Sequence, residues 1–123
     1  MISEEVVVKS VKQSLEILRS RIKTLMPTTL CHIGETIVHD ARQIHASFLK
    51  TPQDDTLDLC ILLRPVGTEF VITGDLVKGG SGDVLSELGP IASSERESKT
   101  EPFEQHVCRY ILDQEDTLIQ ALR

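Results

Sequence analysis

The spacing of apolar positions predicts a long amphipathic helix at the start of the chain, from Ser3 to Leu25. Apolar residues recur there at alternating intervals of three and four, which places them on one helix face. Ser3 with Glu4 and Glu5 suits a helix start, because acidic side chains favour the N-terminal end of the helix dipole, and Pro27 ends the helix. The stripe fits either a helix packed within one domain or a short intermolecular coiled coil. It consists of Val8, Val11, Leu15, Leu18, Ile22 and Leu25.

The same reasoning predicts a second helix from Thr29 to Lys50. Its apolar residues fall on one face at the helical spacing. Gly34 lowers the helix propensity by about 1 kcal/mol, and Pro52 marks the loop that follows. The apolar face consists of Leu30, Ile33, Ile37, Ala41, Ile44 and Phe48.

The middle of the chain predicts a β-hairpin. Residues 57–64 and 68–73 are strand-like, and Pro65-Val66-Gly67 between them suits a turn with Gly67 at positive φ. Both runs are apolar on both faces near their centres, so we expect helices or a second subunit to cover both sides. Because two strands are marginal alone, we expect a third strand near Leu76-Val77 or Val84-Leu85, or pairing across a dimer.

The rest of the chain divides into a loop region and a helix. Residues 74–101 read as a flexible loop region that includes a short strand or a helical turn near Val84. Pro102 to Arg123 reads as a helix with Thr100 as its cap.

The sequence thus predicts one α+β domain over residues 1–123. Its order is helix, helix, β-hairpin, irregular segment or short strand, helix, with the helices packed on a small antiparallel sheet. We expect the N- and C-terminal helices to be antiparallel neighbours.

Composition agrees with one globular domain. The 123 residues are 40% hydrophobic and include 13 basic and 19 acidic residues, for a net charge of −6. Neither an apolar run of ~20 residues nor a signal sequence is present, so we expect no membrane association. Three widely spaced cysteines, without a CxxC pair, fit a reducing cytoplasm.

Charge and aromatic content argue against nucleic-acid binding. The chain has three Phe, one Tyr and no Trp, too few for a base-stacking platform. A pI near 5.1 lacks the basic surface that phosphate backbones select.

Candidate catalytic and metal-ligating residues do not form a convincing set. His32, Glu35 and His39 share one face of the predicted second helix, but that face is the solvated one, so we predict no metal and no cofactor. Neighbouring residues such as Cys31 and His32 point about 100° apart on a helix and cannot form a nucleophile–base pair. We therefore assign no catalytic residue. Functions for His32, His39, His45 and His106 remain open.

A glycine-rich loop is the one candidate ligand site. Its backbone N–H groups could hold an anion, with added charge from Lys78, although neither phosphate-binding glycine motif is present. Asp75, Asp83 and Glu87 nearby would repel phosphate. The loop consists of Lys78, Gly79, Gly80, Ser81 and Gly82.

These observations predict a non-enzymatic protein-interaction module, such as a regulator, an adaptor or an immunity-type inhibitor. The acidic C-terminal half suggests a basic protein partner. One alternative is a small anionic-ligand binder or minor enzyme using the glycine-rich loop, and another is a structural subunit of a homo-oligomer such as a homodimer. The candidate interface residues are Lys12, Arg19, Arg21, Asp113, Glu115 and Asp116.

Overall fold

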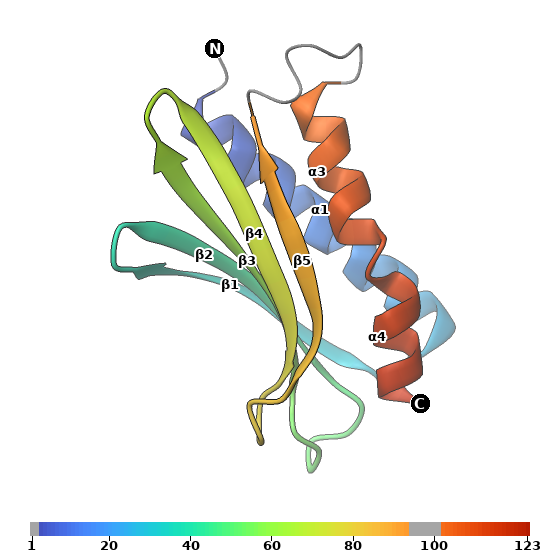
Figure 1. Cartoon of the computed structure of the whole chain (residues 1–123). Coiled ribbons are helices and arrows are strands. Elements are labelled where there is room, and N and C mark those ends of the chain that lie inside the picture. Colours follow the sequence, from blue (N-terminus) through green and yellow to red (C-terminus); the bar gives the residue numbers. More distant parts are fainter. Residues whose placement is uncertain (1–2, 94–101) are drawn as a thin grey trace.

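The computed structural model describes residues 3–93 and 102–123, which form one antiparallel sheet preceded and followed by helices (Figure 1). The strands lie in the order β1-β2-β3-β4-β5, each paired with its neighbour in sequence. The predicted α+β class is correct, but the predicted order of elements is wrong. The elements are α1 (Glu4–Leu25), β1 (Leu30–Val38), β2 (Ala41–Leu49), β3 (Leu57–Val66), β4 (Glu69–Lys78), β5 (Val84–Ala92), α3 (Phe103–Leu112) and α4 (Glu115–Leu122).

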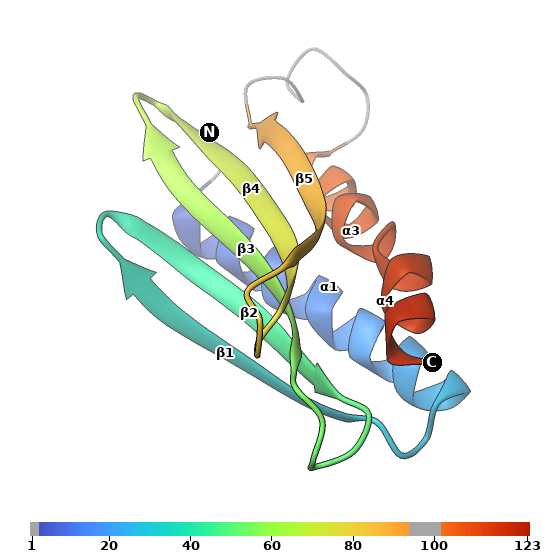
Figure 2. The ribbon, with the colours of Figure 1, turned by 60° about the horizontal axis from the view of Figure 1, so that its bottom comes forward.

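The molecule has two layers, with all the described helices on one face of the twisted sheet (Figure 2). The first helix forms as predicted, and the Ser3 hydroxyl accepts a hydrogen bond from the Val6 N–H at 3.3 Å. Five of the six residues of its apolar stripe are buried in the core of the same chain, whereas Leu25 at the end of the helix is 61% exposed. None of the described helices is long and apolar enough to cross a membrane. The sheet side of the core consists chiefly of Ile44, Ala46, Phe48, Leu59, Ile61, Leu63, Ile72 and Leu76.

The predicted second helix, Thr29 to Lys50, is wrong, because this segment forms the β1–β2 hairpin. The register runs from Leu30 opposite Leu49 to Val38 opposite Ala41. His39 at the turn has a φ of 56°, a left-handed conformation that ends any regular run. The helical spacing was coincidental, since β2 buries alternate residues on the helix-facing side of the sheet.

The predicted β3–β4 hairpin is present, and its turn includes Gly67 at a φ of 64°. The described helices cover only one face of this hairpin, so cover of the other face by a second subunit stays a prediction. The other face of β3 carries the half-buried residues Asp58, Cys60 and Leu62. The third strand expected near Val84-Leu85 is present as β5, which pairs with β4, whereas β1 and β2 extend the sheet on the other side and were not predicted.

The C-terminal half also departs from the predicted order. Where an irregular segment or short strand was expected, the second half of β4 and all nine residues of β5 form strands. The predicted single helix from Pro102 to Arg123 is divided into α3 and α4 at Asp113 and Gln114. The predicted cap, Thr100, lies outside the described residues.

The first and last helices are neighbours, but they run in the same direction rather than antiparallel (Figure 1). A hollow between them is lined by Ser10 and Ile17 of α1 and by Glu104 and Cys108 of α3, so the N-terminal half of α3 lies beside the middle of α1. The strand count explains this direction. An odd number of antiparallel strands returns the chain to the end of the sheet where α1 began.

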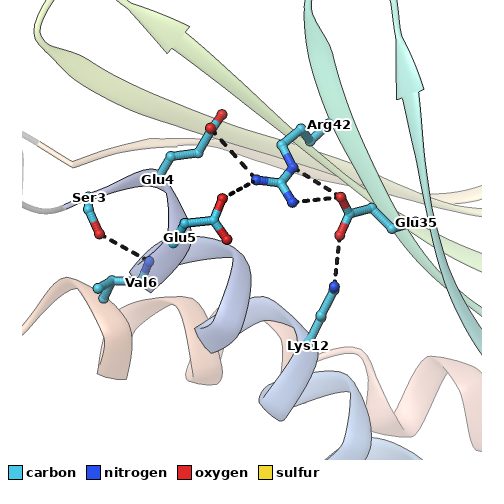
Figure 3. A network of polar contacts seen from close by, with 7 residues as sticks. All are labelled: Ser3, Glu4, Glu5, Val6, Lys12, Glu35 and Arg42. Atoms are coloured by element: carbon cyan, nitrogen blue, oxygen red, sulfur yellow. Dashed lines mark hydrogen bonds and ion pairs between the residues drawn. The ribbon is translucent and has the colours of Figure 1, made fainter.

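A cluster of charged side chains fixes the start of α1 to the β1–β2 hairpin (Figure 3). The Arg42 guanidinium donates to the Glu35 carboxylate at 2.6 and 3.0 Å and to Glu5 at 2.8 Å. Glu4 lies 3.7 Å from Arg42, and Lys12 lies 2.8 Å from the other Glu35 oxygen. The hydrogen bond from Lys12, followed by those from Arg42, lowers the pKa of Glu35 below its usual value.

Glu35→Gln tests the contribution of this cluster. We expect a loss of about 1–2 kcal/mol of unfolding free energy at pH 7, between the values for exposed pairs and for charged hydrogen bonds. Because the pKa of Glu35 is lowered on folding, its contribution is present above its unfolded pKa and is lost as pH falls through the folded value. Urea unfolding from pH 7 to pH 3 should show the difference between wild type and variant shrinking with acid. A difference that grows with acid would contradict the assignment.

Candidate functional site

A groove runs between one flank of α1 and the edge strand β1. Two hollows of about 240 and 410 Å³ form it, and both are lined by Arg19 and Cys31. The smaller hollow lies toward the C-terminal end of α1, and the larger follows β1 from Cys31 to Glu35. Because they share two lining residues, we treat them as one feature, named here the α1–β1 groove.

Apolar side chains form the base of the smaller hollow. Ile22 of α1 and Phe48 of β2 line it, and both belong to the buried core. Cys31 is half-buried beside them, and burial raises the pKa of its thiol to about 11. The thiol is therefore uncharged at neutral pH and packs as a small apolar group.

The rim of the groove carries more cations than carboxylates. Lys12, Arg19 and Lys23 line it, against Glu16 and Glu35. Both carboxylates already pair with cations, since Glu16 contacts Arg19 and Glu35 contacts Lys12. Among the described residues, no carboxylate lies within ion-pair distance of Lys23. The groove is thus locally basic in a chain whose net charge is −6.

The two edges of the sheet differ. β1 pairs with β2 along all nine residues without a register shift. In the part of the chain that the structure describes, no segment other than β2 forms a hydrogen bond with the backbone of β1, so the backbone groups on its outer side have no partner there. The exposed apolar side chains of β1 are Leu30, Ile37 and Val38, at 49, 76 and 41%.

The uncovered face of the sheet carries a row of polar groups across its centre. The register aligns Gly34, His45, Cys60, Asp75 and Glu87 on successive strands. Burial, followed by the charge of Asp75, raises the pKa of the Cys60 thiol to about 11. A nucleophilic cysteine needs the opposite, a stabilised thiolate whose base is oriented by an acid on its far side. Here the acid lies beside the thiol, so the row does not form a catalytic triad.

The sequence-predicted histidine cluster is split by the strand geometry. His32 lies on the uncovered face, Glu35 lies on the helix-facing side and His39 lies in the turn. His32 instead approaches His45, with ring centroids 6.2 Å apart, above Gly34. A Cβ at Gly34 would lie 3.0 Å from His45 Nε2 and 3.2 Å from His32 Nε2. Among the described residues, no three His, Cys, Asp or Glu side chains are placed to hold a metal ion.

The predicted anion loop forms the β4–β5 turn and uses its own amides. Gly79 N–H donates to the Thr56 carbonyl at 2.8 Å, and Gly82 N–H donates to the Lys78 carbonyl at 2.8 Å. The Asp55 carboxylate lies so close to Gly80 that a Cβ there would be 2.1 Å from Oδ2. Because there is no room for a side chain at Gly80, glycine is required there for packing. The Asp55 carboxylate would also repel an incoming anion.

The predicted interface residues do not form one surface. Lys12 and Arg19 line the α1–β1 groove, whereas Arg21 is exposed outside it. The predicted acidic interface residues lie around the α3–α4 junction. Lys12 and Arg19 do not pair with them but with Glu35 and Glu16, respectively. Sequence reasoning missed Cys31 and Glu35 as groove residues because it placed them in a helix. The acidic residues are Asp113, Glu115 and Asp116.

Comparisons with models of protein families, with curated proteins and with solved structures found no match to this chain.

Gly79→Ala tests the packing role of the glycine loop, with Gly89→Ala as its control. A Cβ at Gly79 would lie 2.2 Å from Thr56 Oγ1 and 3.3 Å from the Thr56 carbonyl, whereas one at Gly89 meets nothing within 4 Å. We expect Gly79→Ala to lower the unfolding free energy by about 1–2 kcal/mol. Gly89→Ala should change it by less than about 0.5 kcal/mol in the same urea titration. Equal effects would contradict this account.

Proposed function

We propose that this protein is a non-enzymatic interaction module that binds an extended segment of a partner protein along β1. In this mode, the partner strand pairs with the outer backbone groups of an exposed sheet edge. The observation that carries the proposal is the contrast between the two edges of the sheet, one of which is blocked and one of which is open.

The β5 edge is blocked by several features. Pro90 has no backbone N–H to offer, and the Tyr110 hydroxyl of α3 donates to the Gly89 carbonyl at 2.8 Å. The pairing of β5 with β4 shifts register twice, between Ile72 and Gly74 and between Leu76 and Val77. Proline, irregular pairing and covering elements are the means by which proteins prevent unwanted pairing at sheet edges.

The β1 edge has none of these features. Its register is unbroken, it contains no proline, and its one carboxylate, Glu35, is held by Lys12 and Arg42. An unprotected edge of this length is an aggregation hazard. Its presence opposite a well-protected edge supports a specific use in binding.

The alternatives have less support. The glycine-rich loop is closed to anions by Asp55, which disfavours the small-ligand or enzymatic hypothesis. A homo-oligomer could use the same edge by pairing two copies of β1, and the test below distinguishes this outcome. A basic partner, expected from the acidic C-terminal half, remains a prediction that depends on another surface.

Selection of linear peptides from a random display library tests the proposal, with Ile37→Lys as the blocking variant. A lysine on an edge strand opposes strand addition, and Ile37 is exposed enough for the substitution to leave folding intact. We expect Ile37→Lys to weaken selected peptides at least tenfold, and hydrogen exchange of residues 30–38 to slow when a peptide binds.

Val84→Lys is the matched control, because Val84 is an exposed apolar residue on the opposite edge strand. It should change peptide affinity less than twofold. Failure to select peptides, or peptides that protect another element, would overturn the proposal. Dimerisation at micromolar concentration that Ile37→Lys abolishes would assign the edge to a second copy instead.

A further inference from the structure

We infer that the segment added to β1 presents an apolar side chain with an acidic side chain two residues away. This inference rests on the proposed function and concerns which segment the groove selects. It follows from the base, the rim and the spacing of the α1–β1 groove.

The smaller hollow fits one apolar side chain. Its volume of about 240 Å³ is below the roughly 300–1,000 Å³ of sites that enclose a whole drug-sized ligand. Ile22, Phe48 and the uncharged Cys31 thiol line it. An apolar side chain that enters would displace water from these groups, which is the favourable term in such binding.

The rim beside this hollow favours carboxylates. Arg19 and Lys23 line the same hollow, and Lys23 has no carboxylate partner among the described residues. Glu35 does not oppose an incoming acid strongly, because Lys12 and Arg42 already neutralise it. An acidic side chain placed here is attracted to these cations, whereas a basic side chain is repelled by them.

The spacing of the two elements makes this pattern regular. Every second residue of an added strand faces α1, and such residues lie about 6.6 Å apart along the strand. Arg19 and Lys23 are four residues apart on a helix, which is about 6 Å along its axis. An apolar residue in the smaller hollow beside Arg19 therefore places the next groove-facing residue about one helical turn further along α1, at Lys23. The resulting motif is apolar–x–acidic or acidic–x–apolar, according to the direction in which the strand is added.

Synthetic nine-residue peptides test the motif by fluorescence anisotropy. The first carries Glu, Leu and Glu at alternate central positions with Thr between them, so that one Glu lies near Lys23 in either strand direction. The second replaces Glu by Lys, and the third replaces Leu by Ala. We expect the Glu–Leu–Glu peptide to bind at least tenfold more tightly than either other peptide, with affinity that falls as salt rises from 20 to 300 mM.

Two charge reversals on α1 locate the effect. Lys23→Glu should weaken the Glu–Leu–Glu peptide at least fivefold. Arg21→Glu, the same charge change outside the groove, should alter the affinity less than twofold. Equal effects of these variants, equal affinities of the Glu and Lys peptides, or no binding of the Glu–Leu–Glu peptide would overturn the inference.

The proposed function is judged separately by Ile37→Lys. If all three peptides bind equally and Ile37→Lys weakens each of them, strand addition stands and the acidic motif is wrong. If the peptides bind and Ile37→Lys leaves every affinity unchanged, strand addition itself is wrong, and the motif that depends on it is wrong as well.

Discussion

Burial of one face of the sheet under α1, α3 and α4 is the constraint on which the rest of the structure depends. Ile44 and Phe48 of β2 and Leu59 and Ile61 of β3 lose all exposure because the helices cover this face. A chain of this size can form one such core. The described helices all cover that face, so the other face and the two edges of the sheet are left without helices to cover them.

These three remaining surfaces, the uncovered face and the two edges, differ in how open they are to a partner. The uncovered face mixes polar and apolar residues, and its Cys60 thiol, whose pKa is raised, does not form a catalytic triad with the Asp75 carboxylate beside it. The β5 edge is blocked by Pro90 and Tyr110. Among the described residues, only the β1 edge combines regular backbone, exposed apolar side chains and an adjoining groove, so we propose binding at this edge rather than on the uncovered face.

The sequence allowed some of this to be predicted, and the failures have a physical cause. α1 and the β3–β4 hairpin were predictable because local signals, the Ser3 cap and Gly67, agree with the packing. The segment from Thr29 to Lys50 was not predictable in this way, because its apolar residues recur at the helical period, whereas pairing within the sheet makes it a β-hairpin. The clustered β-branched residues from Ile33 to Val38 favour a strand and were the available signal. Lys12 and Arg19 were selected as interface residues, but the β1 half of their groove could not be recognised from a predicted helix.

The charged cluster at Arg42 also determines which end of the groove can recognise a partner. Glu35 and Lys12 lie at the end toward the start of α1, where Arg42, Glu4 and Glu5 satisfy one another. Charges that are already paired contribute little to the binding free energy of a charged partner residue, because binding would exchange one ion pair for another. Lys23 lies at the other end, beside the apolar base of the smaller hollow. Attraction to an acidic segment is therefore concentrated near Cys31, where an apolar side chain can also be buried, and the two contributions act on the same few residues of the partner.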